Sequence, residues 1–246
     1  MSRLLLRLSY DGTELHGCPE HPEARTVCGV IRQALERVNA PPLEIETLSR
    51  TDAGVHARGN VGHVLLPRDA RPDQVLGWLD RHLPPDLRCT AAARISTLPP
   101  CGPKRYTYRI DRSPWGDPHR ARTAWRVGSP LDLDLLDDLS ASLIGHHDFA
   151  AFRRQGDHRT DLGRTIQHST WVHDADQSTY TIRADRFFYR MIRALVGGMV
   201  ATAAGACTIE DWHEALRGAP THASRQTAPA RGLCLEAISI EADWVD

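Results

Sequence analysis

The segment 50–57, which reads RTDAGVHA, combines residue types that could carry chemistry. A lone Asp in a loop that contains glycine most often only forms a turn. Here Arg50 precedes Asp52 by two positions, Ala53 and Gly54 follow it, and His56 comes four positions later. Small residues let a ligand approach the backbone closely, and loops at strand ends concentrate functional residues. We therefore predict that Asp52 is a functional carboxylate.

The hydrophobic pattern predicts the elements that position this loop. Apolar side chains alternate over 3–10 and recur over 43–48 and 61–66, which predicts three strands, and the loop connects the last two. Thr26 is placed to cap a helix over 27–38, whose apolar residues share one face. The loop is therefore expected at the ends of two strands.

The remainder of the chain repeats a similar order of strands and helices, which indicates two α+β halves with mixed, largely antiparallel sheets. A stretch rich in Pro, Gly and Arg at 113–130 indicates a connection. We therefore assign an N-terminal half, 1–112, that carries the Asp52 loop, and a C-terminal half, 113–246. Helices are expected over 72–83, 131–144, 187–204 and 209–216, and strands over 105–110, 165–172, 180–184 and 233–240.

Composition narrows the class of protein. The 246 residues carry a net charge of −1, whereas nucleic-acid-binding proteins are usually basic, but almost all the cations are arginines, which suit bidentate phosphate contact. The six cysteines form no CxxC pair, so we expect no zinc site. The apolar stretch 191–206 contains Arg193, which argues against a membrane span, and the N-terminus does not look like a signal peptide. We expect a cytoplasmic protein.

The loop motif closely resembles the signature GRTDAGVHA of the TruA family of tRNA pseudouridine synthases, with Ser49 in place of the first glycine. Other segments resemble the same family in order and spacing, so the resemblance spans almost the whole chain. They are YDGT at 10–13, KRYTY at 104–108, GHHDFAAF at 145–152, FFYRMIRALVG at 187–197 and APARGLCL at 228–235.

The resemblance implies the pseudouridine synthase fold, with two α/β halves whose mixed, mainly antiparallel sheets join across a central catalytic cleft. It implies an isomerase that breaks the N1–C1′ bond of uridine and rejoins the base through C5, with no cofactor and no metal. Asp52 would attack C1′, add to C6 or help to form a glycal. The implied catalytic residues are Asp52, Tyr106 and Arg193, and the implied substrate-binding residues are Arg50, Thr51, His56, Arg58 and Leu233.

The family resemblance also assigns roles within this set. Arg193 would pair with Asp52, and Tyr106 would pack on the base, although Tyr106 and Tyr108 share a strand face and either could be core. Arg50 would hold the phosphate beside an extruded nucleotide, and Leu233 would lie against the base. The family's dimeric members suggest a homodimer, for which the residues themselves give no independent indication.

The resemblance to the family is weaker in the segments with which family members contact RNA. Residues 15–21 read LHGCPEH where the family has F-x-G-W/F-Q-x-Q, and Asp185 replaces an Asn. Three functions stay open: a synthase acting on tRNA at anticodon-arm uridines 38, 39 and 40, a diverged synthase acting on a free uridine nucleotide such as UMP, and a non-catalytic RNA-binding paralogue. Retention of Arg50, Asp52 and the two other catalytic positions argues against the third.

These substrates predict different surfaces. A tRNA substrate requires arginines gathered on one face, and a steep salt dependence of binding. A free nucleotide needs one arginine, a mixed-sign surface, and a segment 15–21 that forms a closed turn or folds over the site. The candidate arginines for RNA are Arg50, Arg58, Arg153, Arg154, Arg159 and Arg190.

Overall fold

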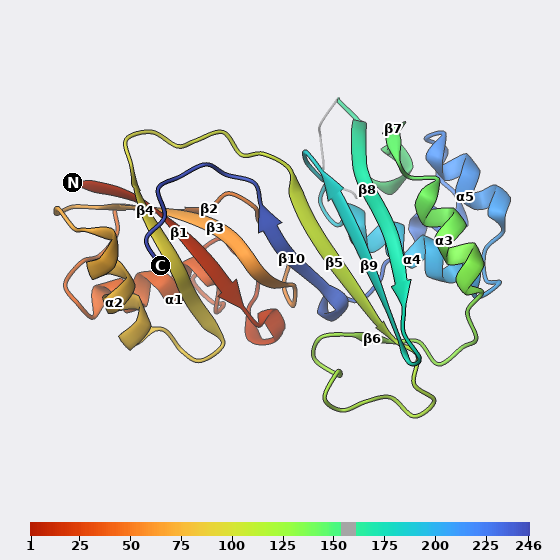
Figure 1. Cartoon of the computed structure of the whole chain (residues 1–246), viewed down its shortest axis with the longest axis horizontal. Coiled ribbons are helices and arrows are strands. Elements are labelled where there is room, and N and C mark those ends of the chain that lie inside the picture. The colour runs from red at the N-terminus through yellow and green to blue at the C-terminus, as the bar shows by residue number, and fades with distance from the viewer. Residues whose placement is uncertain (154–160) are drawn as a thin grey trace. The chain divides into compact units, whose positions relative to one another are not determined.

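The computed structural model of the chain describes residues 1–153 and 161–246, which divide into two compact units (Figure 1). The first unit comprises Met1–Gly102 and Cys234–Asp246, and the second comprises Pro103–Leu233. Both units combine helices with a mainly antiparallel sheet, so the α+β class predicted from the sequence is confirmed.

The first unit is built on a sheet in the order β4-β1-β3-β10, with β2 on β3 as well. Strand β1 pairs antiparallel with both β3 and β4, whereas β10 pairs parallel with β3, placing Cys234 opposite His56. The strand bounds are β1 (Ser2–Tyr10), β2 (Glu44–Thr47), β3 (His56–Leu66), β4 (Leu87–Ile95) and β10 (Leu233–Ile238).

Two helices, α1 (Val27–Glu36) and α2 (Pro72–His82), belong to this unit, together with the short 3-10 turn η1 (Gly12–Glu14). The Thr26 side chain accepts from the backbone N–H of Gly29 and so starts α1, as predicted. The buried face of α1 contains Val27, Val30, Ile31, Ala34 and Leu35. This apolar stripe is what fixes α1 to the unit.

The second unit is built on a sheet in the order β5-β9-β8-β7, with β6 parallel to β5. The strand bounds are β5 (Lys104–Asp111), β6 (Trp125–Arg126), β7 (Gly145–Asp148), β8 (Gly163–His173) and β9 (Gln177–Ala184). The helical elements are α3 (Leu133–Ala141), η2 (Ala150–Phe152), α4 (Met191–Ala203), α5 (Ile209–Leu216), α6 (His222–Arg225) and η3 (Ala230–Gly232).

Helix α4 forms the centre of the helical layer, and most of its residues are buried. Gly197 and Gly198 allow the α6 segment to approach closely, since a Cβ on either would lie within 3.0 Å of backbone atoms between Ala223 and Ala228. We expected this helix to begin at 187, but it begins at Met191, because Arg190 adopts the left-handed conformation with φ 59°. No helix among the described ranges is long and apolar enough to span a bilayer.

The units are not two consecutive halves of the chain. Strand β5 lies before the boundary that we placed after residue 112, yet it pairs with β9 from Lys104 to Asp111. The last residues return to the first unit, where Val245 pairs with Ala92.

Candidate active site

The Asp52 motif forms a tight turn that a single hydrogen bond closes, from the backbone N–H of Val55 to the carbonyl of Asp52 at 3.2 Å. Gly54 occupies the third position of the turn with φ 77°, a conformation that glycine adopts without a steric cost. The backbone N–H of Gly54 also donates to the carbonyl of Leu15 at 3.1 Å. The half-buried Asp52 therefore lies on backbone that is held on its C-terminal side.

His56 joins the loop to the turn after β1. Its Nδ1 accepts a hydrogen bond from the backbone N–H of Gly12 at 3.0 Å and lies 3.2 Å from the Asp11 carboxylate. Because an acceptor needs a lone pair, the neutral ring that takes this bond carries its proton on Nε2. The two segments YDGT and RTDAGVHA, which are far apart in the sequence, therefore form one local structure through His56.

The backbone of Gly12 packs directly against the same loop, and no side chain would fit between them. A Cβ at this position would lie 2.0 Å from the carbonyl oxygen and 2.5 Å from the carbonyl carbon of Val55. These are backbone atoms, which cannot move aside as the end of a flexible side chain can. The close approach of the two backbones thus requires glycine.

A buried polar cluster beneath the loop holds its N-terminal side. The Tyr10 hydroxyl lies 2.9 Å from the Thr51 hydroxyl, and the Asn60 amide donates to the Tyr10 oxygen at 2.9 Å and to the Ser49 carbonyl at 2.9 Å. The Asn60 carbonyl oxygen accepts from the Val61 N–H, which fixes the orientation of the amide. Burial raises the pKa of the Tyr10 phenol, so this hydroxyl stays protonated and can donate to Thr51.

Cys18 completes this cluster. Its Sγ lies 3.2 Å from both the backbone N–H and the hydroxyl of Thr51, and the side chain is fully buried. Cys18 stands where the family that this chain resembles has an aromatic residue, and the thiol instead contacts the residue immediately before Asp52.

Two members of this cluster were not predicted to have a role. The sequence indicated Tyr10 only as part of a motif and gave no role to Asn60. The one feature that could have indicated Asn60 is that it is a polar residue beside the apolar run of a strand.

Removal of the Tyr10 hydroxyl tests this cluster. In Tyr10→Phe, the Asn60 amide and the Thr51 hydroxyl lose a buried partner, so we expect unfolding to require about 1–3 kcal/mol less free energy, with a lower turnover number. Denaturant unfolding and steady-state kinetics measure both. Tyr180→Phe is the matched control, because its buried hydroxyl contacts Ser169 on β8 and should affect stability alone. Wild-type turnover in Tyr10→Phe would contradict the positioning role.

Arg193 and Tyr108 of the second unit both contact the segment 228–229. The Arg193 Nε donates to the Ala228 carbonyl at 2.8 Å, and the Ala228 N–H donates to the Arg193 carbonyl at 2.9 Å. The Tyr108 hydroxyl donates to the Pro229 carbonyl at 2.8 Å. Arg193 is therefore fixed on α4 by its own backbone and by a loop carbonyl, with its side chain half-buried.

Tyr106, which the family resemblance favours for the site, and Tyr108 could each be core from the strand pattern alone, but the two have different surroundings. Tyr106 is almost buried, and its ring meets Phe187 edge-on at a centroid distance of 5.4 Å. Tyr108 is fully buried under Gly232, where a Cβ would lie 2.5 Å from the phenol ring. Burial raises the pKa of Tyr108, so it stays a neutral core residue.

The remaining candidates are distributed over both units. Arg50 is exposed and lines a cavity of about 130 Å³, whereas Arg58 is exposed and lies 3.9 Å from Glu236. Leu233 is buried at the start of β10. Asp52, Arg50, Thr51, His56 and Arg58 belong to the first unit, and Tyr106, Arg193 and Leu233 to the second. That these two groups form one site stays a prediction.

The arginines suggested for RNA are likewise divided between the two units. Arg153 and Arg190 are exposed on the second unit, and the Arg190 guanidinium lies 4.8 Å from the Tyr189 ring centroid. Arg154 and Arg159 lie outside the described residues. Among residues 1–153 and 161–246, no cluster of three or more His, Cys, Asp or Glu side chains could hold a metal ion.

Segment 15–21 folds back on itself. The backbone N–H of His16 donates to the Arg25 carbonyl at 2.8 Å, and His21 pairs with Ala24. Glu20 forms a two-point ion pair with Arg32 of α1, with Nη2 at 2.9 Å from Oε2. The segment is therefore a closed turn, and its acidic residue Glu20 forms an ion pair with Arg32.

The local geometry supports carboxylate chemistry. Asp52 lies on a turn whose neighbours Ser49, Thr51 and Gly54 are each held by hydrogen bonds, so the backbone that carries the carboxylate is positioned before any ligand binds. Such preorganisation favours attack on, or proton removal from, a bound group.

Comparison with known proteins assigns these features to a family. Residues 139–239 match the model of a family described as tRNA pseudouridine synthase. A protein named tRNA pseudouridine synthase A from Syntrophotalea carbinolica is 34% identical over 97% of this chain and 96% of its own length. Proteins of the same name from Streptomyces griseus and Cereibacter sphaeroides are 35% and 33% identical, over 98% and 99% of this chain and 89% and 99% of theirs.

Proposed function

Because this chain belongs to the tRNA pseudouridine synthase A family, we propose that it isomerises uridine to pseudouridine in tRNA. As a pseudouridine synthase, it is an isomerase. The observation that carries the proposal is the turn at Asp52. Hydrogen bonds among Tyr10, Thr51 and Asn60 support this turn and so hold the segment that carries the carboxylate.

Asp52 acts as the catalytic carboxylate in this proposal. Breaking the N1–C1′ bond, turning the uracil and bonding C5 to C1′ conserves every atom except that the C5 proton is exchanged, so no oxidant or group donor is needed. Arg193 stabilises the Asp52 charge, and Tyr106 packs on the base and assists proton removal at C5. Both side chains are held on rigid elements, α4 and β5, which suits positioning roles.

The binding residues take more specific roles. Arg50 is exposed, and its charge is suited to the phosphate beside the extruded nucleotide. Thr51 acts through its hydroxyl contact with Tyr10, and His56 presents Nε2 to the site because Nδ1 accepts from Gly12. Arg58 contacts the RNA backbone, and Leu233 packs against the base.

The proposed target is the anticodon arm, at the three uridine positions that the family resemblance implies, and the proposed assembly is a homodimer acting in the cytoplasm. The names of the relatives, which include tRNA, and their match to nearly the full chain support tRNA as the substrate, whereas the anticodon-arm positions rest on the family resemblance. The homodimer rests on the family resemblance alone.

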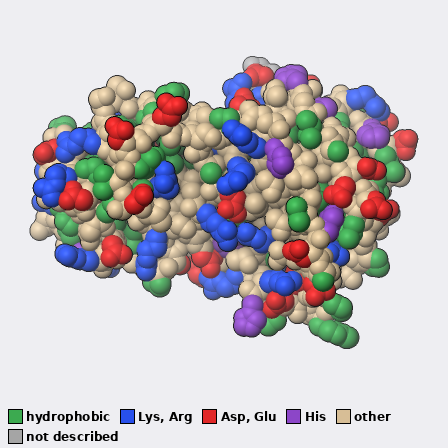
Figure 2. Space-filling view, in the orientation of Figure 1, with side chains coloured by type: hydrophobic (Ala, Val, Ile, Leu, Met, Phe, Trp, Pro, Cys, Tyr) green, Lys and Arg blue, Asp and Glu red, His purple; other side chains and the backbone are tan. Residues whose placement is uncertain are grey.

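A free uridine nucleotide such as UMP is the second candidate substrate, and one observation favours it. Segment 15–21 is a closed turn in which Glu20 neutralises Arg32, as expected for a chain that no longer uses this segment to contact RNA. On each unit, the face in view carries acidic side chains among the basic ones (Figure 2).

Direct comparison of the two substrates distinguishes the candidates. We expect pseudouridine in digested tRNA after incubation with the protein, none from UMP, and tRNA affinity that falls steeply between low and moderate salt, because bound phosphates release counterions. Mass spectrometry of the nucleosides measures the product. Conversion of UMP with none in tRNA would replace the proposal with the second candidate.

A further inference from the structure

The exposed face of the second unit's sheet carries a row of basic side chains across three strands. In the register of the sheet, Arg105 of β5 lies opposite Arg183 of β9, and Arg183 lies opposite His168 of β8. All three are exposed, and blue and purple side chains gather over these strands in Figure 2. Neither guanidinium has a hydrogen-bond or ion-pair partner within 1–153 or 161–246.

The next row supplies hydroxyl groups. Thr107 of β5, Thr181 of β9 and Thr170 of β8 lie side by side in the register, two residues along from the basic row on each strand. Side chains two residues apart on a strand share a face, so both rows face solvent together. Hydroxyl and guanidinium groups are the donors that proteins use for phosphate oxygens.

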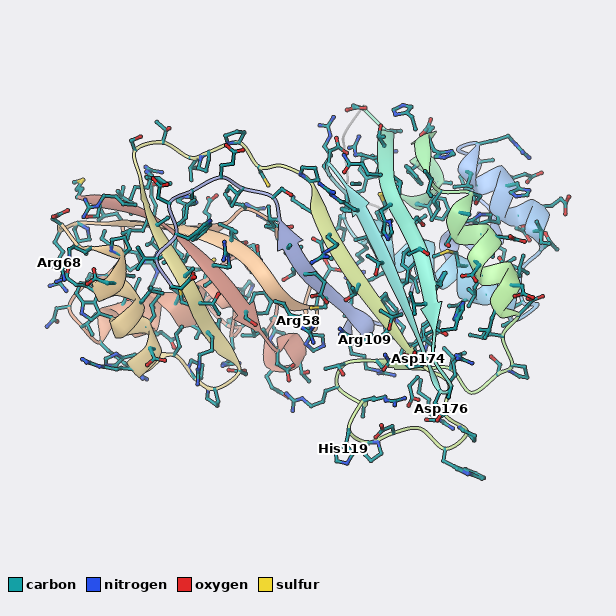
Figure 3. All side chains as sticks on the ribbon, in the orientation of Figure 1. Arg58, Arg68, Arg109, His119, Asp174 and Asp176 are labelled. Carbon is teal, nitrogen blue, oxygen red and sulfur yellow. The ribbon has the colours of Figure 1, made fainter. Side chains whose placement is uncertain are left out.

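Acidic residues do not neutralise the basic row. Strands β8 and β9 contain no Asp or Glu, and the single acid of β5, Asp111, is buried. Arg109 lies towards the end of β5 where the β8–β9 turn carries Asp174 and Asp176 (Figure 3). At the other end, Asp161 and Asp185 are within ion-pair distance of Arg186, at 2.7 and 3.6 Å.

Two arginines directly opposite each other repel, because neighbouring strands lie only about 4.8 Å apart. An anion that binds between them turns this repulsion into attraction. A protein partner is a poorer match, since the cores of protein interfaces are depleted of charge and rich in apolar groups. We propose that Arg105 and Arg183, with His168 and the adjacent threonines, bind the phosphate backbone of the RNA substrate.

This inference rests on the proposed action on tRNA, and the test is a double variant, Arg105→Gln with Arg183→Gln. We expect the slope of log affinity against log salt for tRNA to become shallower by about 1.5, because each phosphate contact contributes about 0.7–0.9. KM for tRNA should rise by roughly tenfold or more while kcat stays unchanged, since these residues act in binding alone.

Two further variants make the result specific. Arg217→Gln with Arg225→Gln removes the same charge from exposed positions at α5 and α6 and should leave both the slope and KM unchanged. Arg105→Lys with Arg183→Lys keeps the charge and should restore most of the slope. Circular dichroism verifies that each variant is folded.

Three outcomes would overturn the inference. Wild-type affinity and slope in the double Gln variant would show that RNA does not bind this face. A double Gln variant that becomes monomeric in sedimentation, from a dimeric wild type, while its tRNA slope is unchanged would assign the face to a protein interface. If the slope of log affinity against log salt fell equally in both double Gln variants, the effect would come from net charge and not from this face. If instead the wild type binds tRNA but forms pseudouridine only from UMP, the proposed function fails, while the binding comparison still tests the face.

Discussion

Asp52→Asn is expected to lower the turnover number by at least about a thousandfold, or ~4 kcal/mol of barrier at 1.36 kcal/mol for each factor of ten. The amide has nearly the shape of the carboxylate but lacks its charge and its nucleophilicity, and every route proposed for this chemistry uses a charged carboxylate. Single-turnover kinetics on tRNA measure the effect on the chemical step.

Asp52→Asn should also fold normally, because the hydrogen bond that closes the turn uses the backbone carbonyl of Asp52. Two measurements provide the control: the melting temperature should equal that of wild type, and the dissociation constant for tRNA should lie within a factor of a few of the wild-type value. Mass spectrometry must exclude deamidation of Asn back to Asp. Turnover near the wild-type value in a sample free of Asp would remove Asp52 from the mechanism.

Gly12→Ala is expected to destabilise the protein by roughly 2–3 kcal/mol, the range of severe overpacking in a well-packed region. The added methyl would meet the backbone of Val55 at 2.0 Å, so either the turn after β1 or the Asp52 loop must shift. A displaced loop moves the carboxylate, and a displacement of about 1 Å can lower turnover about a hundredfold. Urea unfolding and kcat measure the two effects.

Gly77→Ala is the matched control for this substitution. Gly77 lies within α2, and a Cβ there would meet nothing within 4 Å. Alanine in a helix interior should therefore stabilise the protein by about 0.5–1 kcal/mol, with activity unchanged. A Gly12→Ala protein as stable and active as Gly77→Ala would show that the contact with Val55 does not hold the loop.

The sequence predicted elements well where the hydrophobic pattern was strong. Helix α1 and the strand at 3–10 occur where they were expected, because a capping Thr26 and alternating apolar residues determine them locally. Strand β4 was missed, since its run Ala91–Ala92–Ala93 has little β-propensity. It forms because β1 pairs along its length and because the three alanines are completely buried.

Long-range contacts were beyond the sequence pattern. Successive side chains of a strand lie on opposite faces, yet Leu4, Leu5 and Leu6 are all buried, so both faces of β1 are covered. The chain's last residues lie beside β1 and β4, where Trp244 is 4.4 Å from the Arg7 guanidinium. Such a return of the C-terminus leaves no signal in local periodicity.

The motif residues of the candidate site could be predicted from the sequence, but the residues that support them could not. The resemblance to the family supplied Asp52 and the residues around it, because those residues form short ordered motifs. The support from Asn60 and Cys18 could not be predicted, since hydrogen bonds between residues 33 and 50 positions apart depend on the fold. The role of Gly12 likewise follows only from the close approach of two backbones.

Tritium release from tRNA labelled at C5 of its uridines tests the central claim most directly. Bonding C5 to C1′ expels the hydrogen of C5, so each pseudouridine formed releases one tritium to water. We predict release by the wild-type protein, limited to anticodon-arm uridines, and none by Asp52→Asn. Folded wild-type protein that releases no tritium from tRNA, or Asp52→Asn that releases as much as wild type, would contradict the account.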